Sequence, residues 1–385
     1  MSPSPTHPAS HVGARSVPRT VLHLDTERGW RGGERQALWL AQALDRARYR
    51  SIVIARPAQP LAARAVAAGL DVAFLRPFSE VDPFAALALR RMIRKYQAVV
   101  VHAHTAHAVA LAALGAFGTN ARLVVTRRVD FRLRSGALSR WKYGRANALI
   151  AISRAVAGAL VASGIPDNRI EIIPSGIDLT RQIDPVPPAT LASLGIPPAA
   201  PLVIQVSQLV GHKDPVTFIE AMAVARQRVP NVQALLIGSG PLQAQVSSAI
   251  SRLGLQDAVH LAGYRADADS FVAAADVVTL SSREEGLGTV LLDALSLGKP
   301  VAATTGGGIP EIIENGRSGT LVPVGDAQAL GGAIAKLLTE IAGDPARRAS
   351  IAKAARERAA KFSIAVTADR TAAVYDRVLG RGPGV

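Results

Sequence analysis

The sequence predicts an α/β protein built of two doubly wound domains in tandem, and three observations lead to this prediction. Short apolar runs alternate with amphipathic helical stretches along nearly the whole chain. The alternation stops in a proline-rich stretch near residues 184–201 and then resumes. The length of 385 residues is enough for roughly two to three domains of ordinary size. A tandem pair of parallel sheets, each covered by helices on both faces, satisfies all three observations.

In the first half, each expected element follows from its local pattern. The apolar runs are as short as strands that are buried on both faces of a parallel sheet. Expected strands lie at residues 20–24, 51–55, 72–75, 98–101, 123–126, 149–152 and 170–173. Expected helices follow Gly32 and Gly33 as far as Leu44, and lie at 60–69, 83–95 and 106–114.

The second half repeats the same alternation. Expected strands lie at residues 202–206, 232–237, 259–261, 277–280, 301–303 and 320–322. Expected helices lie at 215–229, 241–253, 267–275, 289–298, 309–315 and 326–341, and residues 346–379 are helical by composition. The predicted organisation is a disordered tail (1–19), a first domain (20–183), a linker (184–201), a second domain (202–362) and a C-terminal helix (363–385) that packs back on the first domain.

The composition excludes several classes of protein. The chain has no cysteine, so disulfides, thiolate zinc sites and a cysteine nucleophile are excluded. It offers no run of about 18 apolar residues, so a membrane-spanning helix is not expected. The first 19 residues lack the apolar centre of a signal peptide. These features predict a cytoplasmic protein.

The positive charge is confined to the first half of the chain. Residues 1–183 carry 26 Lys and Arg against 11 Asp and Glu, which gives the full net charge of +15, whereas residues 184–385 carry 18 of each. This asymmetry favours an anionic partner, such as a membrane surface, a phosphorylated lipid or nucleic acid. Nucleic acid is disfavoured because aromatic residues make up only 4% and no base-reading motif is present. The alternative is an arginine-rich surface with no such partner.

Residues 281–293, Ser-Ser-Arg-Glu-Glu-Gly-Leu-Gly-Thr-Val-Leu-Leu-Asp, hold the richest chemistry. The segment follows an expected strand and opens a helix near Thr289, whose free N–H groups favour phosphate. Gly286 and Gly288 let the backbone approach a ligand closely, while Glu285 and Asp293 suit sugar hydroxyls. On spacing alone, the alternative is a glycine turn with capping carboxylates.

This segment resembles the Glu–seven residues–Glu motif of the retaining family-4 nucleotide-sugar glycosyltransferases. Other segments resemble that family in the same order along the chain. They are Ile172–Asp178 (Ile-Ile-Pro-Ser-Gly-Ile-Asp), Ile237–Pro241 (Ile-Gly-Ser-Gly-Pro), His260–Tyr264 (His-Leu-Ala-Gly-Tyr), Ala275–Ser282 and Gly307–Glu311 (Gly-Gly-Ile-Pro-Glu). The resemblance covers about residues 20–380. It implies the GT-B fold, in which two Rossmann-like domains face each other across a cleft.

The resemblance also implies roles for residues of the second half. Glu285 is expected to contact the donor sugar, and Asp293, one methylene shorter than the usual Glu, to bind the ribose. Lys213 matches a lysine that binds the diphosphate, but the arginine expected five residues earlier is Gln208. Arg283, or an arginine of the first half, is a candidate to replace it. Further donor contacts are expected at Gly238, Gly240, Tyr264, Gly286, Leu287, Gly288 and Thr289.

In the first half, Gly32 and Gly33 resemble the family's first Gly-rich loop, which approaches the diphosphate and the acceptor. His104, in the sequence His102-Ala-His104, matches a histidine near the sugar and is a catalytic candidate, with His107 a weaker one. Arg127 and Arg128 are expected to face the cleft, where they suit an acidic acceptor. Without the resemblance, Gly32 and Gly33 are equally typical of an ordinary strand–helix turn, and a lone histidine at a strand end is usually structural.

Together these features predict a retaining hexosyltransferase with a UDP- or GDP-linked sugar donor and no metal or other cofactor. The expected acceptor is a glycan or a lipid-linked glycan of cell-surface polysaccharide or lipopolysaccharide synthesis, met at the inner face of the cytoplasmic membrane. The alternatives are a nucleotide-sugar epimerase of the same shape and a non-catalytic relative.

Two further patterns have competing interpretations. Asp267-Ala-Asp269 matches a metal-binding pattern, but helix capping is the favoured interpretation. The basic run Arg90, Arg91, Arg94 and Lys95 is either a solvated helix face or a face that contacts membrane.

Overall fold

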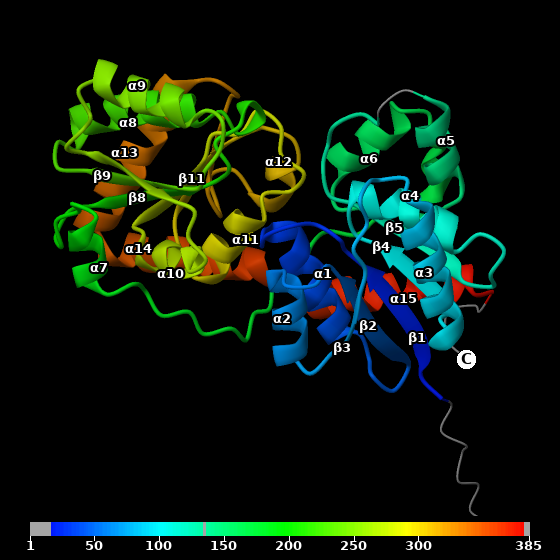
Figure 1. Cartoon of the computed structure of the whole chain (residues 1–385). Helices are drawn as coiled ribbons and strands as arrows, with labels where there is room; N and C mark the ends of the chain where they lie inside the picture. The colour runs from blue at the N-terminus through cyan, green and yellow to red at the C-terminus, as the bar shows by residue number, and fades with distance from the viewer. Residues whose placement is uncertain (1–16, 134–135, 381–385) are drawn as a thin grey trace, which may run out of the picture.

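The computed structural model describes residues 17–133 and 136–380, and it contains two α/β domains that lie side by side (Figure 1). Most of the predicted disordered tail, residues 1–16, lies outside the described residues, and the first strand begins at Arg19. Among the helices of the described part of the chain, none has the length and apolar character that crossing a bilayer requires.

The N-terminal domain is built on a seven-stranded parallel sheet with strand order β3-β2-β1-β4-β5-β6-β7. Its strands are β1 (Arg19–Leu24), β2 (Tyr49–Ala55), β3 (Asp71–Phe74), β4 (Val100–Ala103), β5 (Arg122–Arg127), β6 (Ala148–Ala151) and β7 (Ile170–Ile172). Its helices are α1 (Gly32–Ala43), α2 (Pro60–Ala67), α3 (Pro83–Lys95), α4 (Ala106–Gly115), α5 (Ala137–Gly144), α6 (Arg154–Val161) and the short η1 (Asp167–Arg169).

The C-terminal domain has a six-stranded parallel sheet with strand order β10-β9-β8-β11-β12-β13. Its strands are β8 (Leu202–Val206), β9 (Gln233–Ile237), β10 (Val259–Gly263), β11 (Val277–Leu280), β12 (Val301–Thr304) and β13 (Thr320–Val322). Its helices are α7 (Pro188–Ser193), η2 (Gly211–Lys213), α8 (Pro215–Arg228), α9 (Gln243–Arg252), α10 (Ala268–Ala274), α11 (Thr289–Ser296), α12 (Ile309–Ile312), α13 (Ala327–Gly343) and α14 (Pro345–Ala360).

The strands expected from the apolar runs are present, with boundaries that shift by up to two residues. Three short helices, α5, α6 and α7, were not expected. Helix α7 lies inside the proline-rich stretch, where Pro188 takes the first helical position because proline lacks only an N–H that has no partner there. The same stretch packs on the C-terminal domain, since Val186 and Ile196 are buried.

The chain crosses between the domains twice, and the two crossings are bonded to each other. Ile177 donates its N–H to the Phe362 carbonyl oxygen (2.7 Å), and Ile364 donates to the Ile177 carbonyl oxygen (2.9 Å). After the second crossing, α15 (Ile364–Val378) packs on α1 and the edge of the N-terminal core. The Tyr375 hydroxyl lies 2.6 Å from His102 Nδ1, under the N-terminal sheet.

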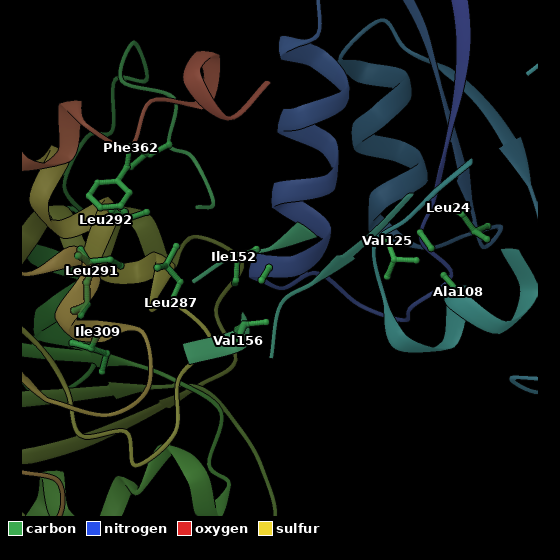
Figure 2. Packing of buried hydrophobic residues seen from close by; sticks show 14 of the residues in the cluster. Leu24, Ala108, Val125, Ile152, Val156, Leu287, Leu291, Leu292, Ile309 and Phe362 are labelled. Carbon is green, nitrogen blue, oxygen red and sulfur yellow. The ribbon is translucent and has the colours of Figure 1, made fainter. Parts of the chain in front are cut away.

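One hydrophobic cluster runs through the interface between the domains. Ile152 and Val156, at the start of α6, belong to the same buried cluster as Leu287 and Leu291 of the C-terminal domain. Figure 2 shows Ile152 and Val156 between the interior of the N-terminal domain and the Leu287 side. The apolar contact therefore fixes how the strand ends of the two sheets face each other.

Candidate functional site

A cavity of about 610 Å³ lies between the domains, at the carboxyl ends of strands from both sheets. In open α/β sheets this edge is where ligands bind. From the N-terminal domain the cavity is lined by Gly29, Trp30, Arg31, Gly32, Gly33, Arg35, Gln36, Pro60, Arg128, Ile152 and Ser175. From the C-terminal domain it is lined by residues that include Gln208, Lys213, Gly238, Tyr264, Asp269, Glu285, Leu287, Gly288, Thr289 and Asp293.

Lys213 and Glu285 form an ion pair on the C-terminal wall. Lys213 Nζ lies 2.5 Å from Glu285 Oε2, and Ser282 Oγ donates to the same carboxylate oxygen (3.2 Å). The Glu285 backbone N–H donates to Asp130 Oδ2 of the N-terminal domain (3.0 Å). Glu285 is thus positioned by both domains, and it brings a cation and a carboxylate together at the cavity wall.

The amino ends of two helices approach each other across the cavity. Gly288, the residue before α11, has a φ of 85°, and Thr289 opens the helix. Gly32 opens α1, and a Cβ added to it would lie 3.0 Å from Thr289 Oγ1. Free N–H groups at helix starts attract anions, so this part of the cavity favours a phosphate group.

Arg128 is a partly buried cation beside these helix starts. Its guanidinium donates to Ser175 Oγ (3.2 Å) and contacts His104 Nδ1 (3.4 Å), while its Nε is buried without a hydrogen-bond partner. Among the described residues no carboxylate forms an ion pair with it, and burial lowers its pKa to about 10. The nearby carboxyls of Asp25 and Glu34 oppose this lowering of the pKa, but neither forms an ion pair with the guanidinium, which can therefore still bind an anion that enters the cavity.

Arg127 does not face the cavity, contrary to the prediction. Its guanidinium is buried and donates to the Val129 and Phe131 carbonyl oxygens (3.1 and 2.9 Å). Arg127 is the last residue of β5, and successive strand residues point to opposite faces, so only Arg128 reaches the cavity. Arg127 instead holds the turn that follows the strand.

Two glycines predicted to contact the donor lie behind the cavity wall. A Cβ at Gly286 would lie 2.1 Å from the Arg128 carbonyl oxygen, and one at Gly240 would lie 2.4 Å from that of Leu209. Gly286 therefore lets the two domains approach each other, and Gly240 lets two loops of the C-terminal domain pack together. Gly238, with a φ of 145°, does line the cavity.

His104 is enclosed with two other histidines at the ends of β1 and β4. His23 Nδ1 lies 3.1 Å from His104 Nε2, and all three rings are buried. Burial lowers the pKa of His23 to about 3 and holds those of His102 and His104 well below 6.5. His104 thus touches the cavity through Arg128, whereas His107 is exposed and pairs with Glu27.

These three histidines form the one group in the described residues with spacing suited to a metal ion. Both ring nitrogens of His102 are already hydrogen-bonded, to Tyr375 Oη (2.6 Å) and Thr126 Oγ1 (2.7 Å). The cationic Arg128 lies alongside. The donor set therefore fits a neutral hydrogen-bonded chain of histidines better than a metal.

Asp293, the expected ribose ligand, is held in an ion-pair network that the sequence did not reveal. Arg35 of α1 pairs with Asp293 and, at 3.0 Å, with Asp269. Arg181 pairs with Asp269 at 2.7 Å, and both guanidinium groups lie over the Trp39 ring. Burial raises the pKa of the Asp293 carboxyl, and Arg35 opposes that shift. The network ties α1 to α10 and α11 beside the cavity.

The helix-capping interpretation of the Asp267–Asp269 pattern is wrong for both residues. Asp267 precedes α10 but makes no side-chain cap and pairs with Arg265 (2.7 Å). Asp269 lines the cavity and binds the two arginines of the network. No local pattern signals this contact, because Arg35 is 234 residues away in the chain.

The remaining donor-side residues surround the cavity mouth. Gln208 lines the wall at the position of the missing arginine. Arg283 does not replace it, because its guanidinium pairs with Asp214 (2.7 Å) and is largely exposed. Tyr264 is exposed and donates its hydroxyl to the Trp30 carbonyl oxygen of the other domain (3.2 Å). Arg128 of the cavity wall is therefore the arginine best placed to take the missing charge.

Family models match both domains. Residues 30–181 match the model for Glycosyltransferase Family 4, and residues 188–358 match the model for glycosyl transferases group 1. The chain belongs to the family-4 glycosyltransferases. The family predicted from the motifs is thereby confirmed.

Relatives of this glycosyltransferase include bacterial enzymes of glycan synthesis. It is 34% identical over 149 residues to the lipopolysaccharide core biosynthesis glycosyltransferase LpsE of Rhizobium meliloti, which covers 39% of this chain and 43% of LpsE. It is 32% identical over 197 residues to the amylovoran biosynthesis glycosyltransferase AmsK of Erwinia amylovora, covering 49% of this chain and 47% of AmsK. The matches span about half the length of these curated relatives.

Solved structures confirm the predicted fold. HepE of Anabaena, crystallised with UDP-glucose, superposes with a TM-score of 0.79 at 24% identity, over 93% of this chain and 99% of HepE. Sucrose-phosphate synthase of Thermosynechococcus elongatus superposes with a TM-score of 0.73 at 22% identity, over 94% of this chain and 99% of that chain. Both share the arrangement of two Rossmann-like domains of the GT-B fold.

Proposed function

We propose that this glycosyltransferase transfers a hexose, with retention of configuration, from a UDP- or GDP-linked donor to a glycan or lipid-linked acceptor in cell-surface polysaccharide or lipopolysaccharide synthesis. The observation that carries the proposal is the Lys213–Glu285 pair, which faces two helix starts and the partly buried Arg128 across one cavity. The arrangement offers cations for a diphosphate next to a carboxylate for sugar hydroxyls. The named activities of LpsE and AmsK support the glycan class.

The difficult part of the reaction is the negative charge that grows on the departing diphosphate. Lys213, Arg128 and the N–H groups at the start of α11 stabilise that charge in place, which is worth most in a site that excludes water. No metal or other cofactor enters this proposal, because the chain itself offers the positive charge. Lys213 leaves its pairing with Glu285 when the diphosphate arrives, and Glu285 then accepts hydrogen bonds from the sugar.

The chemical step exchanges one bond for another at the anomeric carbon. The bond between that carbon and the diphosphate oxygen breaks, and a bond to the acceptor oxygen forms on the same face of the sugar. The acceptor's hydroxyl proton passes to the departing phosphate oxygen. His104 supports this site through its contact with Arg128, and its buried ring stays neutral above its low pKa.

Donor binding in this proposal involves Asp293 together with Arg35. The Asp293 carboxylate already binds Arg35, so a ribose hydroxyl meets a carboxylate–guanidinium pair. One oxygen, Asp293 Oδ1, is buried without a hydrogen-bond partner and is the acceptor left for it. Tyr264 and Gly238 then flank the base and phosphates at the cavity mouth.

The test is a donor panel. The full chain is incubated with UDP-glucose, UDP-galactose, UDP-N-acetylglucosamine and GDP-mannose, and released nucleoside diphosphate is measured by mass spectrometry. We expect slow hydrolysis of one donor without acceptor and faster release with an extract of lipid-linked glycans. Thermal stabilisation by a nucleotide without any turnover would favour the non-catalytic alternative. We also propose that the protein is located in the cytoplasm and contacts the inner face of the cytoplasmic membrane.

A further inference from the structure

Three arginines surround a second hollow, of about 300 Å³, on the N-terminal domain. Arg28, Arg56 and Arg76 lie in the loops that follow β1, β2 and β3, three neighbouring strands of the sheet. In the described part of the chain none of the three forms an ion pair with a carboxylate. Three unpaired guanidinium groups around one hollow at the carboxyl edge of a parallel sheet favour a phosphate ligand.

The hollow is built by hydrogen bonds that connect the loops. Arg56 donates to the Thr26 carbonyl oxygen and to the Pro77 carbonyl oxygen, both at 2.7 Å, and so joins all three loops. Gln59 Oε1 accepts from the Gly29 N–H (3.0 Å). Arg28 and Arg76 stay exposed on either side. Arg56 therefore holds the hollow, while Arg28 and Arg76 are free to bind what enters it.

An apolar edge lies directly beside the hollow. Phe78 is 90% exposed and Phe84 is 80% exposed, and they follow Arg76 by two and by eight residues. Their positions are fixed, because the Asp82 carboxylate accepts from the Phe78 N–H (2.9 Å) and the Phe84 N–H (3.0 Å). Exposed phenylalanines held in place by a buried carboxylate are typical of a contact surface.

The outward face of α3 continues this edge. Phe84 and Leu87 are exposed in its first turns, and Arg91 and Lys95 follow on the same side at helical spacing. Helix α3 lies on the side of the domain away from the C-terminal domain (Figure 1). Arg90 does not belong to this face, because it donates to the Gly115 and Leu114 carbonyl oxygens at the end of α4.

We propose that this edge and the arginine hollow together form a membrane-docking surface for anionic lipid. Phe78, Phe84 and Leu87 enter the interfacial layer of the bilayer, and Arg28 and Arg76 bind a lipid phosphate in the hollow that Arg56 holds together. The charge supports this occupant over an apolar protein partner, because the basic groups border the apolar side chains as they do in membrane-surface segments. The outward basic residues of α3 add attraction to an anionic surface.

The arginine hollow of this surface is connected to the main cavity. Gly29, which is bonded to Gln59 of the hollow, lines the main cavity, so the two sites share one loop. A phosphate bound in the hollow would place the glycan of a lipid-linked acceptor at the carboxyl edge of the N-terminal sheet, which faces Glu285 of the C-terminal domain across the main cavity. This placement of the glycan rests on the proposed transferase function, whereas the docking itself does not.

The experiment measures co-sedimentation of the full chain with phosphatidylcholine vesicles that contain or lack phosphatidylglycerol, at low and high salt. We expect binding only to the anionic vesicles, and release at high salt. Phe78→Ser with Phe84→Ser should weaken partitioning at least about tenfold, from the loss of two buried aromatic groups. Arg28→Gln and Arg76→Gln should each weaken it about fivefold.

The control is Phe117→Ser, which removes a phenylalanine that is 54% exposed and follows α4, at the opposite end of the strands. Thermal unfolding followed by circular dichroism verifies the fold of every variant. Equal binding to neutral vesicles, or an equal loss in the control, would overturn the docking surface. UDP-glucose hydrolysis without vesicles is measured in parallel. Turnover without vesicle binding overturns only the docking surface, and vesicle binding without turnover of any donor overturns only the transferase.

Discussion

The two domains share a doubly wound design but differ in their net charge and in where their phenylalanine side chains lie. Residues 1–183 carry the entire net charge of +15, and residues 184–385 are neutral. The five phenylalanines of the N-terminal domain (Phe74, Phe78, Phe84, Phe117 and Phe131) are exposed, whereas the three of the C-terminal half (Phe218, Phe271 and Phe362) are buried. The C-terminal domain uses its apolar groups for its interior and its polar groups for a cavity. The N-terminal domain presents both kinds of group outward.

The largest effect is expected from Glu285, the residue that both domains hold in place. Glu285→Gln should reduce transfer about 10³-fold or more, because the sugar loses its charged partner where charge develops. The measurement is nucleoside diphosphate release with the preferred donor. Glu284→Gln, at an exposed neighbouring position, is the matched control and should retain activity. Comparable rates in the two variants would refute the site.

A substitution of Lys213 tests the predicted role of the C-terminal domain in binding the donor diphosphate. Lys213→Ala should lower the rate about 10²-fold, the size of one lost transition-state donor. Lys213→Arg keeps the charge and should recover part of the rate, which separates charge from shape. A loss of less than about threefold in the alanine variant would mean that another cation carries the diphosphate.

A substitution of Arg128 tests whether the basic N-terminal domain supplies the positive charge that the C-terminal domain lacks at Gln208. Arg128→Gln should slow turnover by about tenfold, and Gln208→Arg alone should keep or raise activity. The combined variant is the sharper measurement, because a cation restored at position 208 should recover much of the rate. If the double variant is as slow as Arg128→Gln, Arg128 does not substitute for the missing arginine.

The smallest effect expected is a pH dependence of stability that arises mainly from the N-terminal domain, although burial also lowers the pKa of His212 and His260 in the C-terminal domain. Burial depresses the pKa of His23, His102 and His104, so below pH 6.5 the unfolded chain binds protons that the folded one does not. Each histidine then lowers stability by about 1.4 kcal/mol per pH unit as the pH falls. Asp25 acts oppositely, because burial raises its pKa to about 7 and the folded form gains a proton first.

The net expectation is a loss of about 1 to 3 kcal/mol in unfolding free energy between pH 6.5 and 5.5. Urea unfolding followed by tryptophan fluorescence measures it, because Trp30, Trp39 and Trp141 all lie in the N-terminal domain. Asp25→Asn removes the opposing proton and should steepen the dependence. A stability that stays constant over this range would contradict the neutral histidine cluster.

The sequence was sufficient for features that depend on local pattern. Lys213 and Glu285 each follow a buried strand. They could therefore be placed at one edge of the sheet, because parallel strands end on the same side. Arg127 and Arg128 could not be told apart, since one residue of shift in the end of β5 exchanges which of them faces the cavity. The Arg35–Asp293 pair joins positions 258 residues apart, and neither has a neighbouring signal for the other. The tertiary packing alone brings them together.

The return of the last described helix to the first domain sets an order of assembly. His102 sits at the end of β4 with one of its ring nitrogens 2.6 Å from Tyr375 Oη, and Tyr375 is made only after the whole C-terminal domain. During synthesis, the surface of the N-terminal sheet that α15 covers in the finished protein therefore stays exposed to water until α15 has been made. The ribosome must deliver some 270 further residues after His102 before that helix can seat. Chaperone contact in this interval would fall on the face around Val100 and Tyr49, which α15 closes last.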